Sequence, residues 1–280
     1  MQKSIKKCFP IFVIPTVIAF IISFIAPFIM GIYLSFTKFT TLIDSEWVGI
    51  GNYVKAFSDD KFLNSLEFTV KFTVVSIISI NVLAFMLALI LTKALKGTNF
   101  FRATFFMPNL IGGIVLGYIW LLIINGFLGL MGVTITYDPS YGFMGLVLLM
   151  NWQLVGYMMI IYIAGIQNVS EDLLEAADID GANSRQKLFK ITIPQVMPSI
   201  TICTFLTLTN SFKLYDQNLA LTNGAPNDKT QMLALNIVDT FYGRPGWQGV
   251  GQAKAVLFFI IVAVIALTQL YLTRRKEDTA

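Results

Sequence analysis

One segment concentrates the charged side chains of an otherwise apolar chain. It covers positions 170–199 with the sequence SEDLLEAADIDGANSRQKLFKITIPQVMPS. Five acids come first and three bases follow: Glu171, Asp172, Glu175, Asp178, Asp180, Arg185, Lys187 and Lys190. Such groups form ion pairs with a partner, and they make the segment too polar to cross a bilayer. We interpret it as a docking element for another protein; a solvated amphipathic hairpin between two membrane spans is the alternative.

The residue order within this segment predicts two short helices with a bend between them. Ser170 is placed to cap the first helix. Gly181 is a natural stop, because glycine tolerates the left-handed backbone found at helix ends. Asn183 followed by Gln186 indicates the start of the second helix. Pro194 falls near the first turn of the next apolar stretch, where proline is well accepted.

A second set of polar residues lies in or beside stretches that are apolar enough to cross a membrane. In chain order these residues are Asn151, Trp152, Gln153, Asn210, Ser211, Tyr215 and Asp216. A buried polar group without a partner is costly, so polar residues inside a span need an explanation. One interpretation is that these residues line a binding site for a polar molecule. Hydrogen bonds between helices, worth about 1 kcal/mol each, are the alternative, and they are the expected role of Asn81.

The sequence lacks the residues that would let the chain drive transport by itself. It has no histidine and no Gly-Lys dipeptide, so it has no phosphate-binding loop of the form G-x-x-x-x-G-K-[ST]. Ion-coupled carriers generally hold acids or His deep in the membrane, and no apolar stretch has them at its centre. Lys71, Lys213, Asp216 and Lys254 fall at the ends of these stretches, where they can snorkel. The absence of an energy-coupling group inside the chain, together with the docking segment, therefore indicates a separate motor.

Two other classes of protein are the alternatives to a motor-driven transporter. The first is a proton- or sodium-coupled carrier working alone. The second is a membrane enzyme or sensor, for which the sequence offers no nucleophile–base pair and no metal cluster. We expect no catalytic residue, no metal and no cofactor in this chain.

The composition identifies the medium in which these elements lie. Of the 280 residues, 56% are hydrophobic and 13% are charged, whereas a soluble domain is about 25% charged. Six stretches between charged residues suit a bilayer core about 30 Å thick: Lys7–Lys38, Lys71–Lys93, Arg102–Asp138, Asp138–Glu171, Lys190–Lys213 and Lys254–Arg274. Because helices satisfy their own backbone groups in lipid, we expect an all-α polytopic membrane protein with six transmembrane helices. The first stretch is too long for a signal peptide, the alternative for it.

The distribution of Lys and Arg predicts the orientation, because cytoplasmic loops carry an excess of them. Twelve of the 20 fall on the side of the termini: Lys3, Lys6, Lys7, Lys93, Lys96, Arg102, Arg185, Lys187, Lys190, Arg274, Arg275 and Lys276. We expect both termini in the cytoplasm and no nucleic acid partner. The external loops then cover about 37–66, 126–141 and 216–252, with short helices expected in the first loop and at MLALNIVDTFY in the third.

The charged segment resembles the signature of binding-protein-dependent ABC importer permeases. In that signature E-A-A is followed after three residues by Gly and after nine more by I-x-L-P. Here Glu175-Ala176-Ala177 precedes Gly181 and Ile191-Thr192-Ile193-Pro194, with Ile193 in place of Leu. GIGNYVKAF, FFRATFFMPNL and LTNGAPNDKT resemble the maltose and multiple-sugar branch of the family, although Ala225 replaces the second Gly of a TxGGP segment. The resemblance runs along nearly the whole chain.

This resemblance implies a role for each part of the chain. Residues 1–66 would hold the first transmembrane helix and an external loop, 67–275 a five-helix permease core with the coupling loop at about 167–196, and 276–280 a cytoplasmic tail. The ATPase-coupling residues would be Glu175, Ala176, Ala177, Asp180, Gly181 and Pro194. Glu175 would stand at the tip of the docking surface, facing a base of the ATPase.

The same resemblance places the substrate path along the two stretches that carry the polar residues from Asn151 to Asp216, and it implies the partners and the cargo. The partners would be a second permease subunit, a cytoplasmic ABC ATPase dimer, an extracellular or periplasmic solute-binding protein, and lipid of a bacterial inner membrane. The cargo would be a sugar or oligosaccharide, with another polar solute such as glycerol phosphate as the alternative. The sequence does not identify which sugar is carried.

Overall fold

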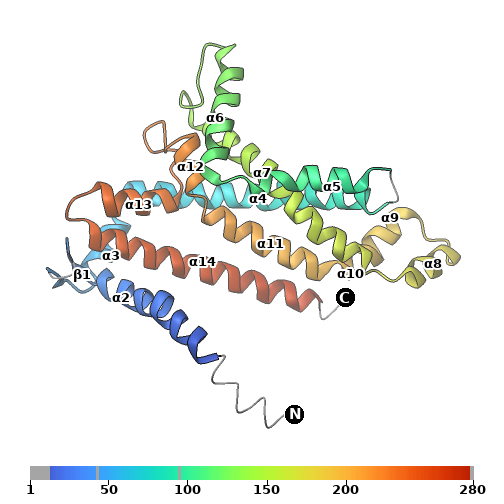
Figure 1. The fold of residues 1–280 in the computed structure, drawn as a ribbon, viewed down its shortest axis with the longest axis horizontal. Coiled ribbons are helices and arrows are strands. Elements are labelled where there is room, and N and C mark those ends of the chain that lie inside the picture. The colour runs from blue at the N-terminus through green and yellow to red at the C-terminus, as the bar shows by residue number, and fades with distance from the viewer. Residues whose placement is uncertain (1–12, 42–43, 94–95, 278–280) are drawn as a thin grey trace, which may run out of the picture. The chain divides into compact units, whose positions relative to one another are not determined.

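The computed structural model describes residues 13–41, 44–93 and 96–277, and from 274 onward the backbone alone. Lys3, Lys6, Lys7 and Cys8 lie outside the described residues, as does the end of the expected tail. The described chain is mainly helical (Figure 1). Its elements are η1 Ile21–Ile25, α2 Ala26–Ser35, β1 Thr37–Lys38, β2 Glu46–Trp47, α3 Gly51–Phe57, α4 Asp60–Leu91, α5 Thr98–Phe106, η2 Met107–Leu110, α6 Gly113–Gly129, α7 Pro139–Gln167, α8 Glu171–Ile179, α9 Ser184–Lys187, η3 Leu188–Thr192, α10 Ile193–Gln195, α11 Met197–Phe212, α12 Asp216–Leu221, α13 Leu233–Gly243 and α14 Gln248–Glu277.

Four continuous helices are long and apolar enough to cross a membrane. They are Val13–Ser35, Asp60–Leu91, Pro139–Gln167 and Gln248–Thr273. Two bent pairs, Thr98–Leu110 with Gly113–Gly129 and Ser184–Gln195 with Met197–Phe212, raise the number to as many as six when each pair is one span. The described residues therefore form a multi-pass membrane protein with four to six candidate spans, each overlapping a stretch that the sequence predicted.

Both bends lie where the sequence carries helix breakers. The first bend is 103°, and at it Ile111 and Gly112 adopt extended backbone just after the 3-10 turn of Pro108. The second bend is 67° and centres on Val196, between Pro194 and Pro198. Proline lacks an N–H and clashes with the preceding turn. Pro108, Pro194 and Pro198 therefore account for a break in each of these two apolar stretches.

The chain divides into two compact units. One holds Met1–Phe62 and Ile237–Ile260, and the other holds Leu63–Asn236 and Ile261–Ala280. In the first unit, Asn52 of α3 donates hydrogen bonds to the carbonyls of Ser35 and Thr37 at 2.9 and 2.8 Å. The short antiparallel pair β1–β2 matches Thr37 with Trp47. These two short strands differ from the all-α expectation. They form because the backbone N–H and C=O groups of a loop also need hydrogen-bond partners.

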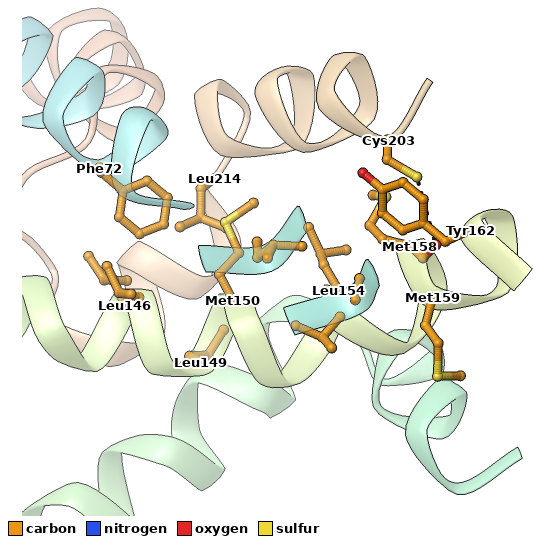
Figure 2. Packing of buried hydrophobic residues seen from close by; sticks show 14 of the residues in the cluster. Phe72, Leu146, Leu149, Met150, Leu154, Met158, Met159, Tyr162, Cys203 and Leu214 are labelled. Atoms are coloured by element: carbon orange, nitrogen blue, oxygen red, sulfur yellow. Dashed lines mark hydrogen bonds between the residues drawn. The ribbon is translucent and has the colours of Figure 1, made fainter. Parts of the chain in front are cut away.

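The second unit packs around α7. Its buried cluster includes Met150, Met158, Met159, Tyr162 and Cys203 (Figure 2). In the most apolar part of α7, 61% of the residues are buried. The corresponding shares are 0% for Val13–Ser35, 28% for Asp60–Leu91 and 6% for Gln248–Thr273. Apolar surface of this extent faces lipid or another subunit.

A polar bridge crosses the same unit between α4, α7 and α11. The Tyr162 hydroxyl donates to Asn81 Oδ1 at 2.7 Å, and Asn81 Nδ2 donates to Thr207 Oγ1 at 3.5 Å. Asn81 thus packs against neighbouring helices, as the sequence predicted.

The structure also tests the expected loops and span ends. The short helices expected in the first and third external loops are confirmed as α3 and α13. The helix α4 begins at Asp60, inside the expected loop of 37–66, because a helix continues through charged residues beyond its apolar part. Lys254 was wrongly expected to snorkel: its side chain is fully buried and pairs with Asp59. The sequence could not show that an acid 195 positions away would compensate its charge.

Candidate functional site

The first candidate site is the hairpin of α8 and α9, which we call the coupling hairpin. Helix α8 ends in a Schellman motif: Gly181 N–H donates to the Asp178 carbonyl at 3.0 Å, and Ala182 N–H donates to the Ala177 carbonyl at 2.9 Å. Gly181 has φ of +75°, a left-handed conformation that glycine adopts without strain. The predicted stop and bend are therefore confirmed.

The start of α9 is fixed by a complete capping box. Gln186 N–H donates to Asn183 Oδ1 at 2.9 Å, and Asn183 N–H donates to Gln186 Oε1 at 2.8 Å. Lys187 then reaches back to Asp178 of α8, with 2.6 Å between Nζ and Oδ1. Ser170 stands at the N-cap position of α8, but its side chain accepts no capping hydrogen bond there. Local interactions thus define the shape of the hairpin.

The coupling hairpin presents most of its signature residues to its surroundings. Glu175, Ala176, Asp180 and Gly181 are exposed, whereas Ala177 is buried. Beside the acids, Ile179 is 87% exposed. A charged rim around an exposed apolar side chain is the composition expected of a protein-docking surface.

The hairpin continues directly into α11 through η3 and α10 (Figure 1). Pro194 lies in the first turn of α10, just before the 67° bend, so it lies near the start of the span rather than within the first turn of α11. At the beginning of α11, Ser199 packs directly against Gly165 of α7, leaving no room for a side chain on that glycine. This contact joins the start of α11 closely to α7.

The second candidate site is a small polar pocket of about 130 Å³ in the second unit. Its polar lining comes from four elements: Asn109 of η2, Gln153 of α7, Asn210 and Lys213 at the end of α11, and Gln217 of α12. Gln217 Nε2 donates to Gln153 Oε1 at 2.9 Å. Amides in these positions offer donors and acceptors together, the pattern that binds hydroxyl groups.

The glycine at the start of α6 allows α12 to lie against it beside this pocket. A Cβ atom on Gly113 would be 2.7 Å from Asp216 Cβ and 3.0 Å from Gln217 Cδ. Any side chain there would push α12 away and separate Gln217 from Gln153. A close helix contact therefore sets the position of the pocket wall.

The predicted substrate-path residues do not all reach this pocket. Gln153 and Asn210 line it. Ser211 is fully buried and donates to the Thr207 carbonyl at 2.8 Å. Asn151 donates to Ser79 Oγ of α4 at 2.9 Å, which is helix packing. Their place on the path stays a prediction.

The remaining predicted path residues, Trp152, Tyr215 and Asp216, do not line the pocket. Trp152 is 44% exposed and stacks edge-on with Trp120 of α6, with ring centroids 5.9 Å apart. Tyr215 is half-buried at the N-cap of α12, and Asp216 is exposed in its first turn. Trp152 lines an adjoining apolar hollow of about 290 Å³ together with Pro108 and Asn151.

Three pocket residues were not among the predicted site residues. Lys213 falls at the end of an apolar stretch, where the sequence predicts snorkelling, and Gln217 directly follows the predicted residue Asp216. Asn109 carried no signal, because it reaches the pocket only through the bend after η2. Among the described residues no group of three His, Cys, Asp or Glu could hold a metal ion.

Comparison with known families identifies the architecture. The family of binding-protein-dependent transport system inner membrane components matches residues 96–278. The chain belongs to this family. It is therefore a transport permease subunit of ABC importers, which removes the ion-coupled carrier and the membrane enzyme or sensor as alternatives. The matched region contains both the coupling hairpin and the polar pocket.

Two curated relatives cover nearly the whole chain. The "probable starch degradation products transport system permease protein AmyD" of Thermoanaerobacterium thermosulfurigenes is 43% identical, over 95% of this chain and 94% of its own. The "multiple sugar-binding transport system permease protein MsmF" of Streptococcus mutans is 30% identical, over 95% of both chains. A crystal structure of a bacterial ABC transporter that imports the acidic polysaccharide alginate has a chain with the same fold, at a TM-score of 0.83 and 20% identity over 98% of both chains.

Proposed function

We propose that this permease subunit moves a sugar or oligosaccharide across a bacterial inner membrane. The amides of the polar pocket support the proposal, because Gln153, Gln217, Asn109 and Asn210 carry both the donors and the acceptors that suit hydroxyl groups. The names of the two relatives favour the same class of cargo. The cargo would be delivered by an external solute-binding protein.

The proposed topology has six spans with both termini in the cytoplasm. Each bent pair then counts as one span, and the Lys and Arg bias puts the coupling hairpin inside. The proposed division is 1–66 for the first helix and outer loop, 67–275 for the permease core, and 276–280 for the tail. A second permease subunit would cover the apolar spans that this chain leaves exposed.

The proposed mechanism separates the motor from the path. A cytoplasmic ABC ATPase dimer would hold the coupling hairpin through Glu175, Ala176, Ala177, Asp180 and Gly181. Closure of the dimer would displace the hairpin as one body, because its own hydrogen bonds fix its shape. The displacement would pass by Pro194 into α11, which carries Asn210 at its far end. The hydrolysis of ATP would take place only in the partner.

The test is uptake by the intact complex in proteoliposomes loaded with ATP. A panel of neutral oligosaccharides competes against one labelled sugar, and collapse of the ion gradient serves as a control. We expect sugar-dependent competition and no loss of uptake when the gradient collapses. Uptake that needs the gradient, or that no sugar reduces, would contradict the proposal.

An anionic solute such as glycerol phosphate is the second candidate. The observation that favours it is Lys213, a cation that lines the pocket beside the amides. The same competition panel therefore includes glycerol phosphate, and preferential competition by it would replace the sugar assignment.

A further inference from the structure

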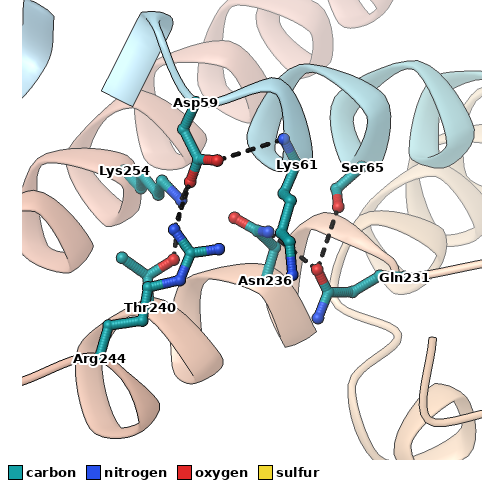
Figure 3. Close-up of polar contacts among 8 residues, drawn as sticks. All are labelled: Asp59, Lys61, Ser65, Gln231, Asn236, Thr240, Arg244 and Lys254. Atoms are coloured by element: carbon teal, nitrogen blue, oxygen red, sulfur yellow. Dashed lines mark hydrogen bonds and ion pairs between the residues drawn. The ribbon is translucent and has the colours of Figure 1, made fainter. Parts of the chain in front are cut away.

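A buried ion network lies in the first unit, apart from the coupling hairpin and the polar pocket. The ammonium of Lys254 donates to Asp59 Oδ2 and to Thr240 Oγ1, both at 2.7 Å (Figure 3). Arg244 donates through Nη1 to the same Asp59 oxygen at 3.0 Å. Burial raises the pKa of Asp59, but the hydrogen bond from Lys254 and the charges of Lys254 and Arg244 together leave that pKa below its ordinary value. One ionised carboxylate is therefore shared by two cations.

Arg244 extends from this network to the surface. Its side chain is 29% exposed, and its guanidinium carbon lies 5.2 Å from the ring centroid of Trp247. The hydrogen bond to Asp59 is the only one that the Arg244 side chain makes among the described residues, although a guanidinium has five donors. Donors thus remain for a second carboxylate.

The residues around Arg244 match the composition of interface hot spots. Tyr242 is 80% exposed, and Gly246 turns the chain with φ of +79° so that Trp247 returns beside Arg244. Tyr, Trp and Arg are the residues most often found at the energetic centres of protein interfaces. Since Asp59 and Trp247 already hold the guanidinium, little further ordering is needed on binding.

We propose that the segment 242–247 is a docking surface for a carboxylate-bearing face of the external solute-binding protein. The inference rests on the proposed function, which places the connection between α13 and α14 on the external side. A partner carboxylate at Arg244 would balance the second cation of the network, and Tyr242 would supply the adjoining apolar contact. Electrostatic complementarity of this kind favours both fast association and a defined register.

The test measures the dissociation constant of the sugar-loaded solute-binding protein of the same transport system for the complete transporter in nanodiscs, at low and at physiological salt. Arg244→Gln is expected to raise that constant about tenfold, as for a hot-spot residue, and to weaken its salt dependence. Tyr242→Ala is expected to raise it about threefold without touching the ion network. Lys55→Gln removes an exposed cation of α3 in the same unit and is expected to leave it within about twofold.

Two further measurements keep docking apart from stability and from the proposed function. Thermal unfolding of the complex shows whether Arg244→Gln weakens the fold, and Tyr242→Ala tests the surface independently if it does. Wild-type affinity in both Arg244→Gln and Tyr242→Ala would overturn the docking surface while leaving the importer intact. A wild-type transporter that takes up sugar without binding any solute-binding protein would overturn both proposals.

Discussion

The coupling hairpin and the polar pocket are built in opposite ways. Every hydrogen bond that shapes the hairpin joins residues at most nine positions apart. The pocket instead gathers side chains from position 109 to position 217 and depends on two bends and a close helix contact. A self-contained hairpin transmits force as one body, whereas a pocket assembled from several helices changes shape when any of them moves. We therefore expect substitutions in the hairpin to lower the rate of uptake, and substitutions in the pocket to change the KM for uptake.

The largest expected effect is on the bend of the hairpin. Gly181→Pro fixes φ near −65°, whereas the native φ is +75°, so the Schellman motif cannot form. We expect uptake to fall at least about tenfold, a cost of roughly 1–3 kcal/mol for a forced backbone. The measurement is initial uptake rate, with membrane insertion followed by immunoblot.

The matched control for this change is Gly181→Asn, because asparagine is accepted at left-handed helix ends. It should keep most of the uptake. Equal loss in both variants would mean that the small size of Gly181, rather than the bend, is what the motor requires.

Glu175→Lys is expected to have the next largest effect. Glu175 is exposed on α8, so reversal of its charge should leave the hairpin folded, and it would repel a base of the ATPase at the proposed contact. We expect about a tenfold loss of uptake, which corresponds to about 1.4 kcal/mol, because like charges that meet at an interface oppose binding. The measurement is uptake together with the amount of ATPase that copurifies, and Glu171→Lys, at the start of the same helix, is the control. If Glu175→Lys and Glu171→Lys lower uptake equally, Glu175 would have no specific role in binding the ATPase.

The same difference explains which features could be predicted from the sequence and which could not. Gly181, Asn183 and Gln186 act through neighbours in the chain, so their order alone predicted the hairpin. Lys254 and Asn109 act through residues far away in sequence, and their roles depend on helix packing that periodicity does not encode. Lys254 looks like a span end until Asp59 is placed beside it. Ser211 and Asn210 are adjacent in the sequence, and only the packing shows that Asn210 lines the pocket while Ser211 is fully buried.

Substitutions in the pocket should change the affinity for the substrate and leave the maximal rate of ATP-driven uptake unchanged. Asn210→Ala removes an exposed amide at the pocket wall, and we expect the KM for uptake to rise about three- to tenfold, the effect of one lost hydrogen bond. The measurement is KM and maximal rate in proteoliposomes. Ser211→Ala, one position on but buried away from the pocket, is the control and should leave KM unchanged. A fall in maximal rate without a change in KM for Asn210→Ala would mean that α11 serves the motor rather than the substrate.

The smallest expected effect concerns the ion pair between Asp178 and Lys187, which lies within the hairpin. The pair is close, at 2.6 Å, but the Asp178 side chain is 60% exposed, and an exposed pair contributes only about 0.2–1 kcal/mol. Asp178→Lys should lower uptake by about two- to fivefold, the rate equivalent of that energy, and Asp178→Lys with Lys187→Asp should recover most of it, because the reversed pair closes the same bend. Recovery would mean that the two residues act on each other to set the angle between α8 and α9. If the double variant does not recover uptake, Asp178 would instead act through contact with the ATPase. The shape of the hairpin would then depend partly on the ATPase and not only on its own contacts.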